Sequence, residues 1–597
     1  MSKAKERAEH FFHHETQFHL GVLVTEQSHP TTARFSQTIQ KNTEEGVKNF
    51  LEVDQDIPPV AERVLASQEY QQLVDAFIRC TDEHHRICFS GCGASGRVAI
   101  ILEAMWRAAW KKAAAHLPEK REEYTAFADQ VISIMTGGDR ALIRSVENFE
   151  DYQIFGRRQV SDAELGRDDV LIAMAEGGVV SSVIGSAKEA HERGAHVFLI
   201  FNNPKDILTR HIQRSREVIE IPEITHFDLT TGHTALTGST RLQPTSIAML
   251  ILGAAMEECI ATIIARDYPL YVEEIQGPPP STMRDTYAAF FKDLVDQLSS
   301  ERAVRGLARF VDLETKIYSQ HGLVTYIAAR YLLDIFSDTT ERTPTFMIPP
   351  FHQYDDLSAP EPWAFAKDPL HPSREAWDNL LQREPRGLDW TQEDYLDMGA
   401  QEDIITNPPI LTNAEIYKFP IGKEDYPARY QSRDARPCVS ALIWVFFEEE
   451  IDPQFQKYFS GNLANYTHPT LVTMGSSSLD MPGAETIHIP FTVPKTCCDL
   501  FYHLAVKLIF NTLSTATMGK MGRISGNWMI QVDATNKKLT DRAIRIISHI
   551  ARIPYDNACC ELFTTMENPE IDRLQFKESY VIQTLRRLGV EVGQENI

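Results

Sequence analysis

Two glycine- and hydroxyl-rich turns carry the residue types that bind phosphate. The first turn, residues 91–97 (Gly-Cys-Gly-Ala-Ser-Gly-Arg), follows the apolar run 86–90 and precedes a helical pattern that starts at Val98. A strand that leads through such a turn into a helix presents unpaired backbone N–H groups and the positive end of the helix dipole to an anion. The spacing matches neither a dinucleotide fingerprint nor a P-loop, so a nucleotide is not the expected ligand. On its own, the turn is equally compatible with an ordinary strand-to-helix connection.

The second turn, residues 237–242 (Thr-Gly-Ser-Thr-Arg-Leu), precedes a helical run at 247–252. Helix capping accounts for one hydroxyl group, whereas this turn has three hydroxyls within four residues and an arginine beside them. Two such turns in one domain predict a pocket for one phosphorylated, hydroxyl-rich ligand. The residues that we expect to bind this ligand are Gly93, Ser95, Gly96, Ser239 and Thr240.

Five short apolar runs alternate with helical patterns between residues 61 and 255, which is typical of a parallel sheet covered by helices on both faces. The runs expected to form strands are 86–90, 131–135, 170–175, 196–201 and 217–221. Ligands of such sheets bind beyond the carboxyl ends of the strands, where both turns fall.

The same order of elements recurs downstream and predicts a second parallel sheet. Its expected strands are 323–328, 344–348, 439–447, 471–474 and 486–489. The first of them continues into Ala-Ala-Arg-Tyr at 328–331, so we expect this copy to lack a phosphate turn. An insertion of about 350–436, which bears prolines and tryptophans, separates the second strand from the third. An insertion of that length is either functional or loosely ordered.

Composition and charge exclude several classes of protein. The chain has 597 residues, of which 59 are basic and 83 acidic, and a net charge of −24. No dense basic run outlines a nucleic-acid surface, no apolar run reaches the ~18 residues of a membrane span, and the charged N-terminus lacks the apolar core of a secretory signal. The nine cysteines are scattered and lack CxxC spacing. We therefore expect a reduced, cytoplasmic protein without a metal site or a cofactor.

Several motifs together resemble one superfamily. Residues 93–97, 136–140 (Thr-Gly-Gly-Asp-Arg), 146–151 (Val-Glu-Asn-Phe-Glu-Asp) and 236–241 are similar to motifs of two groups of proteins, the bacterial N-acetylmuramic acid 6-phosphate etherases and the glucokinase regulatory protein family. Both groups belong to the SIS (sugar isomerase) superfamily, whose domains bind phosphosugars. An etherase has one SIS domain, whereas this chain is long enough for two, which favours the regulatory-protein architecture.

That resemblance implies an α/β fold with two SIS-type, flavodoxin-like parallel-sheet domains, helices on both sheet faces and a C-terminal helical cap. We expect an N-terminal arm at 1–60, a first SIS domain at 61–285, a degenerate second SIS domain at 286–498 and a helical region at 499–597. The two domains would form a pseudo-dimer within a monomer.

The resemblance also assigns roles to single residues. The second catalytic glutamate of the etherases matches Glu150, but the first, nine residues after the serine-adjacent glycine, falls on Met105. Loss of one carboxylate from an acid/base pair removes a rate contribution of roughly 10²–10⁴-fold, so we expect the chain to sense a phosphosugar rather than convert it. The regulatory protein also lacks the first glutamate, and Lys538 matches a lysine that lies near its sugar phosphate.

Other positions leave alternatives open. The third turn, 175–180, has lost a serine that both relatives carry, and Glu176 brings a carboxylate near the expected phosphate. A solvated loop residue is an equally good interpretation of Glu176. The rival function is a sugar-phosphate lyase, etherase or isomerase acting on an amino-sugar 6-phosphate such as N-acetylmuramic acid 6-phosphate, with Glu150 assisted by Glu147 or His233.

A protein partner is implied by the same resemblance, namely a sugar kinase. Its docking surface would lie near the helical cap that contributes Lys538. The insertion around 350–390 is the alternative docking surface, and an irregular loop packed on its own domain is the simpler interpretation of that insertion.

Overall fold

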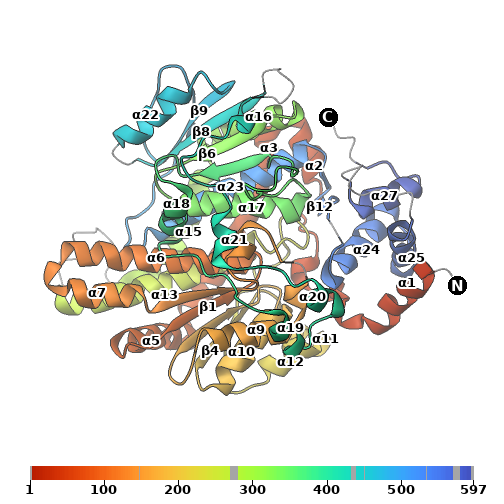
Figure 1. Cartoon of the computed structure of the whole chain (residues 1–597), viewed down its shortest axis with the longest axis horizontal. Helices are drawn as coiled ribbons and strands as arrows, with labels where there is room; N and C mark the ends of the chain where they lie inside the picture. Colours follow the sequence, from red (N-terminus) through yellow and green to blue (C-terminus); the bar gives the residue numbers. More distant parts are fainter. Residues whose placement is uncertain are drawn as a thin grey trace.

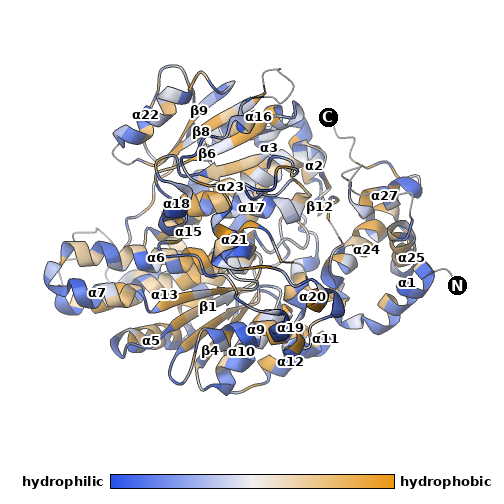
Figure 2. Cartoon of the chain, in the orientation of Figure 1, coloured by the Kyte–Doolittle hydropathy of each residue, from blue (hydrophilic) through white to orange (hydrophobic). Residues whose placement is uncertain are grey.

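The computed structural model describes residues 3–146, 148–268, 280–431, 438–448, 451–532, 534–568 and 578–592. Two five-stranded parallel sheets form the centres of two α/β domains, one above the other in Figure 1, and a helical cap lies beside them. Apolar residues concentrate on the strands and on the helix faces that cover them, while the outer faces are hydrophilic (Figure 2). The predicted fold class is therefore confirmed.

The first sheet has the strand order β2-β1-β3-β4-β5, and its neighbouring strands are all parallel. The strands are β1 (Ile87–Gly91), β2 (Val131–Met135), β3 (Val170–Met174), β4 (His196–Phe201) and β5 (Thr225–Asp228). β1 and β3 are buried at every position, as continuous apolar runs in a doubly covered parallel sheet should be. This order places the carboxyl ends of β1, β2 and β3 side by side, where a flavodoxin-like sheet binds its ligand.

Helices cover both faces of this sheet. They are α5 (Gln68–Asp82), α6 (Ala94–His116), α7 (Arg121–Ala128), α8 (Arg140–Ile143), α9 (Gln153–Asp162), α10 (Ser181–Glu192), α11 (Lys205–His211), α12 (Gln213–Ile219) and α13 (Gln243–Asp267). The strand predicted at 217–221 is wrong, because that run closes α12, and the fifth strand is β5. β5 is an edge strand, which pairs on one side only and tolerates polar residues, so its sequence signal is weak.

The second sheet has the order β10-β9-β8-β6-β7, again with parallel neighbours throughout. Its strands are β6 (Leu323–Ile327), β7 (Ala364–Lys367), β8 (Ser440–Phe446), β9 (His468–Met474) and β10 (Glu485–Ile489). Its helices are α15 (Pro280–Leu298), α16 (Glu301–Ser319), α17 (Leu332–Phe346), α22 (Pro453–Asn462) and α23 (Leu500–Lys520). When its strands are numbered from β6, the sheet has the same order as the first, which confirms the repeat.

The second strand of this sheet differs from the prediction. Residues 344–346 belong to the last turn of α17, and β7 lies inside the region expected to be an insertion. The sequence predicted a strand here for two reasons. Proline is unfavourable inside a helix, and the apolar run that follows Pro344 resembles a strand. The segment between β7 and β8, residues 368–431, is called the crossover segment below. It contains α18 (Ser373–Leu381), α19 (Gln392–Asp397), α20 (Glu402–Thr406) and α21 (Asn413–Tyr417).

The crossover segment packs on the first domain, not only on its own. Figure 1 shows it descending from the second domain to α9 of the first, where Arg158 forms an ion pair with Asp394 at 2.9 Å. Tyr395 and Leu411 join a hydrophobic cluster with Phe149 and Phe155. The expectation of a loop packed on its own domain is therefore wrong, because aromatic residues on both sides bury one another.

A network of buried charges fixes the same contact. Arg386 donates to Glu103 of α6 at 2.7 and 2.9 Å, and Arg383 forms ion pairs with Glu103 and Asp139. The backbone N–H of Asp139 also donates to the Arg386 carbonyl at 2.9 Å. Glu103 is 1% exposed, so the positive charges of these arginines compensate its negative charge in place of water.

The N-terminal arm reaches both domains and the cap. Its helices are α1 (Lys3–His14), α2 (Phe35–Lys41), α3 (Thr43–Glu52) and α4 (Ile57–Leu65). α1 packs on the cap, α2 and α3 pack on α23 of the second domain, and α4 packs on α13 and α15. The arm therefore ties together parts of the chain that are distant in sequence.

The cap is a small helical unit with its own core. α24 (Lys537–Ala551), α25 (Tyr555–Met566) and α27 (Tyr580–Arg587) bury apolar side chains against α1. A two-stranded ribbon, β11 (Ile524–Ser525) with β12 (Trp528–Met529), precedes it. α23, which was expected to belong to the C-terminal helical region, packs instead in the large central core with α13 and α16.

One helix, α13, is long and apolar enough to cross a membrane, judged by length and composition alone. The sequence analysis did not find it, because it looked for an uninterrupted run of apolar residues. Its most apolar window is 94% buried inside the protein. This burial accounts for its apolar character, because a helix surrounded by other elements is hydrophobic on all sides.

Candidate ligand pocket between the domains and the cap

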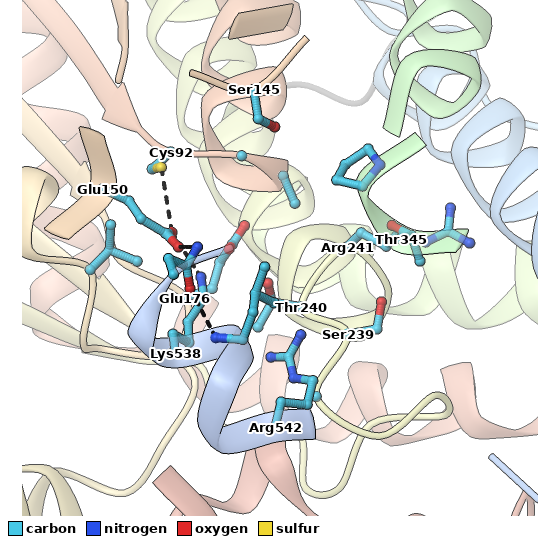
Figure 3. A pocket seen from close by; sticks show the side chains of 18 of the residues that line it. Cys92, Ser145, Glu150, Glu176, Ser239, Thr240, Arg241, Thr345, Lys538 and Arg542 are labelled. Carbon is cyan, nitrogen blue, oxygen red and sulfur yellow. Dashed lines mark hydrogen bonds and ion pairs between the residues drawn. The ribbon is translucent and has the colours of Figure 1, made fainter. Parts of the chain in front are cut away.

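A cavity of about 240 Å³ lies at the carboxyl edge of the first sheet. Its walls come from three parts of the chain: turns of the first domain, helix α17 of the second domain and helix α24 of the cap (Figure 3). A cavity of this kind holds a small molecule rather than a macromolecule.

Gly93 shapes the first turn. It caps α6 with a φ of +57°, a left-handed conformation that favours glycine, and it lines the cavity with open space where a side chain would stand. A ligand can therefore approach the N–H groups at the start of α6. Ser95 and Gly96 are not among the described residues that line the cavity. The Ser95 hydroxyl accepts a hydrogen bond from the Cys92 N–H and donates one to the Cys92 carbonyl, each at 3.0 Å, and so closes the turn itself.

Ser239 and Thr240 of the second turn line the cavity. Gly238 (φ +77°) lets this turn pass close to an ion pair, because a side chain there would approach Arg542 to 2.6 Å and Glu26 to 2.7 Å. The turn is thus positioned by charges that join the arm to the cap.

Two arginines of the cavity wall have structural partners. Arg241 forms an ion pair with Asp338 of α17 at 2.9 Å and so links the two domains. Arg97 donates to the carbonyl oxygens of Gly93 and Leu142, at 3.1 Å each.

Glu150 and Lys538 form an ion pair in the cavity wall (Figure 3). The Lys538 ammonium lies 2.8 Å from Oε2 of Glu150, and the Asn536 amide donates to Oε1 at 2.8 Å. Burial lowers the pKa of Lys538, but the charge of Glu150 and its hydrogen bond, together with the nearby Cys92 thiol, outweigh burial and raise the pKa. The Cys92 sulfur is 3.9 Å from the same carboxylate, and burial together with the Glu150 charge raises the pKa of this thiol to about 12. The pair joins the cap to the first domain.

Met105 does not lie in this cavity. It lines a second cavity, of about 610 Å³, at the carboxyl edge of the second sheet. In return, α17 of the second domain contributes Glu341 to the first cavity. Met105 follows the end of β1 by the same number of residues as Glu341 follows the end of β6, so the two residues occupy equivalent positions in the repeat. Each of them lines the cavity of the other domain.

The neighbours of these residues follow the same pattern. Ala108 and Ala109 line the second cavity, and Pro344 and Thr345, at the corresponding spacing, line the first. The inference that the site has lost a carboxylate at the position of Met105 is therefore wrong, because Glu341 brings a carboxylate to the first cavity from the other domain. The sequence analysis missed Glu341, although its spacing from the repeated first strand was a usable signal.

Glu176 is a buried residue of the cavity wall and not a solvated loop residue. It is 3% exposed, and its Oε1 has no hydrogen-bond partner among the residues that the structure describes. Burial, reinforced by the nearby charge of Glu341, raises the pKa of Glu176 well above its usual value. Its carboxyl group therefore holds a proton more readily than the carboxyl group of an exposed glutamate does.

Residues 69–188, which include the first turn, Glu150 and Glu176, match the family model of the glucokinase regulatory protein N-terminal SIS domain. The chain therefore contains an SIS domain. This domain belongs to a family of phosphosugar-binding domains, and it is related to the glucokinase regulatory protein and, more distantly, to etherases.

Two curated relatives of this SIS protein are etherases. N-acetylmuramic acid 6-phosphate etherase 1 of Bacillus licheniformis is 27% identical over 234 residues, which is 39% of this chain and 67% of the relative. The N-acetylmuramic acid 6-phosphate etherase of Bacillus subtilis is 27% identical over 225 residues, or 37% of this chain and 65% of the relative. Among solved structures, the C-terminal domain of glucosamine-fructose-6-phosphate aminotransferase from Francisella tularensis aligns over 78% of this chain and 95% of that chain, with a TM-score of 0.41 and 10% sequence identity.

Of the two other candidate acid/base residues, the structure describes only His233, and it lies away from the cavity wall. The His233 ring nitrogen Nδ1 lies 3.1 Å from the Ser28 carbonyl, and His233 is not among the described residues that line the cavity. Glu147 lies outside the described residues.

The second SIS domain holds a carboxylate of its own where an anion could bind. After β9, the N–H groups of Ser476 and Ser477 donate to Glu448 at 2.5 and 2.9 Å, and the Tyr502 hydroxyl donates at 3.1 Å. Burial raises the pKa of Glu448, but these hydrogen bonds outweigh it and lower the pKa. The ionised side chain thus takes up donors that an anionic ligand would need.

The described residues include one group that could hold a metal ion, namely Glu257, Cys497 and Cys498, whose ligand atoms lie within 4.8 Å of one another. Glu257 already accepts hydrogen bonds from the Tyr287 hydroxyl and from the N–H groups of Cys498 and Leu500. Burial raises the pKa of Glu257 to about 7. These hydrogen bonds satisfy the carboxyl group, so we assign the group a structural role.

Proposed function

We propose that this protein binds a phosphosugar and signals its occupancy through the arrangement of its parts, as a protein of the glucokinase-regulatory-protein type. The observation that carries this proposal is the composition of the cavity wall, which combines the first SIS domain, α17 of the second and α24 of the cap. A ligand that contacts all three parts binds best when they are packed together around it. It therefore stabilises this closed arrangement relative to an open one.

The chemistry of the wall suits a phosphorylated ligand. The start of α6 offers backbone N–H groups, and Ser239 and Thr240 offer hydroxyl donors. These groups bind phosphate without a dedicated cation. The remaining polar groups of the wall suit sugar hydroxyls.

Replacing Ser239 by Ala tests the binding assignment. A hydrogen bond to a charged group contributes about 1.5–3 kcal/mol, so we expect the affinity for the bound phosphosugar to fall about ten- to a hundredfold. The ligand is first chosen by a thermal-shift screen of hexose 6-phosphates, fructose 1-phosphate and amino-sugar phosphates, and its affinity is then measured by calorimetry. Ser358→Ala, in an exposed loop, is the matched control and should bind like the wild type. Equal affinity of S239A and the wild type would contradict the assignment.

A regulatory role also requires a protein partner, and we propose a sugar kinase in a reducing, cytoplasmic compartment. Lys538 links the cap to the cavity through Glu150, so a partner that contacts the cap would sense the ligand. Affinity capture from the native cytoplasm, with and without the selected phosphosugar, tests this. Recovery of a sugar kinase that depends on the ligand is the expected result, and recovery of the same proteins under both conditions speaks against regulation.

A second candidate function, ether cleavage or another acid/base conversion, is favoured by the presence of Glu341 in the same cavity as Glu150. Two carboxyl groups in one small cavity can act as acid and base. We expect lactate release from N-acetylmuramic acid 6-phosphate to fall at least about a hundredfold in both Glu150→Gln and Glu341→Gln if the protein is an enzyme. Met105→Leu, in the other cavity, is the control. Absence of turnover in the wild type would leave the binding function alone.

A further inference from the structure

The second cavity is built like a separate ligand site. It measures about 610 Å³ and lies at the carboxyl edge of the second sheet, as the first cavity does in the first domain. Its walls come from α6 of the first domain and from the second domain. They include an apolar surface formed by Ala104, Met105, Ala108, Leu333, Leu380 and Phe455. A cavity of this size suits a small molecule.

The charged groups of this wall already have partners on the protein. The pairs are Asp334–His503 at 2.9 Å, Asp368–His371 at 2.7 Å and Arg330–Asp499 at 2.7 Å. The Asp452 carboxylate accepts hydrogen bonds from the N–H groups of Gln454 and Phe455 and so caps α22. The remaining charged residue of the lining, Lys112, is exposed to solvent. The wall formed by the described residues thus presents no buried charge without a partner.

Two of these pairs leave hydrogen-bonding atoms for a ligand. In both, the carboxylate lies against Nδ1 of the imidazole ring. The other ring nitrogen, Nε2, is then the atom that a ligand can contact, and it donates or accepts according to the tautomer. Nε2 of His371 is 3.8 Å from Glu375, which is beyond hydrogen-bond distance. The Asn379 amide lines the same cavity and offers donors as well as an acceptor.

A charged ligand does not suit this wall. A phosphate or an ammonium group that leaves water needs an unpaired opposite charge, and the charged groups of the wall are paired or solvated. A phosphate would also find the N–H groups of Ser476 and Ser477, after β9, bonded to Glu448.

A purely apolar ligand does not suit the wall either. It would displace water from the imidazole Nε2 atoms without replacing the hydrogen bonds of that water. The class of ligand that remains is uncharged and has hydroxyl groups on a body that packs against the apolar surface. A free sugar or a polyol meets this description.

Helices α6 and α17 connect this cavity to the first one. α6 begins at the first cavity with Ala94 and Arg97, and its later turn with Met105 lines the second. α17 begins at the second cavity with Leu333 and reaches the first with Glu341. The two helices pack on each other (Figure 1). Because a helix moves as a rigid element, a shift at one cavity is felt at the other.

A small polar cavity of about 30 Å³ lies at the contact of the two helices. Its lining includes Arg97 and Glu341 of the first cavity and Asp334 of the second. Nε of Arg97 and the Ser337 hydroxyl are buried there without a hydrogen-bond partner among the described residues. The space is large enough for water, so these atoms can exchange partners when either helix shifts.

We propose that the second cavity binds an uncharged sugar or polyol, and that α6 and α17 couple its occupancy to phosphosugar binding in the first cavity. The assignment of the second site stands on its own wall, whereas the coupling rests on the proposed phosphosugar-binding function. A chain with both sites responds to a free sugar and to a sugar phosphate together. Each ligand then changes the affinity for the other by the same factor.

The second site is tested by calorimetry of the full chain with glucose, fructose, N-acetylglucosamine and myo-inositol. We expect at least one of these neutral ligands to bind. Glucosamine, whose amine is protonated at a pH of about 6, should bind at least about tenfold more weakly than the tightest of the four. Binding of none of the four, or equal binding of glucosamine, would overturn the assignment.

Two variants locate the bound ligand. Ala108→Trp on α6 and Asn379→Trp on α18 change exposed residues and place an indole in the second cavity, so both should abolish binding of the neutral ligand. Ala115→Trp is the matched control, because Ala115 is exposed on α6 and is not among the described residues that line the cavity. All three proteins should keep the melting temperature of the wild type. Binding that survives in both A108W and N379W would place the ligand elsewhere and overturn the site.

The coupling is tested with the phosphosugar selected in the thermal-shift screen. Its affinity should change at least about fivefold when the neutral ligand is present at saturation, in the wild type and in A115W, and should not respond to the neutral ligand in A108W. No response in the wild type, or a response that persists in A108W as direct competition would, contradicts the coupling. If no phosphosugar binds, the proposed function fails and the coupling with it, whereas the titrations with neutral ligands still decide the second site.

Discussion

Replacing Glu26 by Gln is expected to lower the free energy of unfolding by about 3–5 kcal/mol, the usual cost of removing one partner from a buried ion pair. Glu26 is 5% exposed and lies 2.6 Å from Arg542 and 2.5 Å from Arg545, both on α24. The variant leaves the Arg542 guanidinium buried against a neutral amide, and Arg545 keeps only its ion pair with Asp541 at 2.8 Å. Urea denaturation and the melting temperature measure the loss, and Glu62→Gln, exposed on α4, should show almost none.

The same ion pairs predict a response to acid. Burial raises the pKa of Glu26, but the charges of Arg542 and Arg545 outweigh it and lower the pKa from 4.5 to about 2. A carboxyl group with a depressed folded-state pKa stabilises the protein fully above its unfolded pKa and loses this contribution as the pH falls toward the folded value. The wild type should therefore lose stability between pH 4.5 and about 2, and this part of the loss should be absent in E26Q. Equal acid sensitivity of the two proteins would contradict the assignment.

Replacing Glu103 by Gln should cost a similar amount, about 3–5 kcal/mol, and should loosen the crossover segment. Glu103 bonds to Arg386 at 2.7 Å, to Arg107 at 3.0 Å and to the Ser133 hydroxyl at 2.6 Å, and it forms an ion pair with Arg383 at 3.0 Å. The neutral amide of glutamine cannot compensate the positive charges of three arginines in the protein interior. Denaturation measures the loss, and limited proteolysis within 368–431 should become faster.

A surface variant controls for the change of charge. Glu122→Gln, exposed on α7, removes the same charge without touching the crossover segment and should behave like the wild type. Because the segment packs beside Phe149, next to Glu150, E103Q should also weaken ligand binding. Unchanged proteolysis in E103Q would show that the aromatic contacts alone hold the segment.

Much of the sheet could be predicted from the sequence, because buried parallel strands are continuous apolar runs. The strands at 131–135 and 196–201 coincide with β2 and β4. Both missed strands, β5 and β7, are short edge strands, and a strand with one neighbour needs little apolar surface. The crossover segment was misjudged for another reason, since its aromatic residues are complementary to a surface of the other domain, and no local pattern carries that information.

Local sequence patterns predicted the candidate site only where a single domain builds it, whereas Lys538 of the cap was predicted from the family resemblance and also lines the cavity. Gly93, Ser239 and Thr240 line the cavity because local turn chemistry places them there. Ser95 has the expected residue type but uses its hydroxyl to close its own turn. Glu341 arrives from the other domain, and its place follows only from the geometry of the repeat.

Helix α6 of the first domain lines the cavity of the second, and α17 of the second lines the cavity of the first. This arrangement has a consequence for how such a protein can evolve. Two identical subunits that each contributed this helix to the partner's cavity would carry the same residue in both cavities, and every mutation would alter both at once. A duplicated and fused chain is free of that constraint. Here the position holds methionine in one copy and glutamate in the other, so each cavity can acquire its own specificity while the two sheets keep the same strand order.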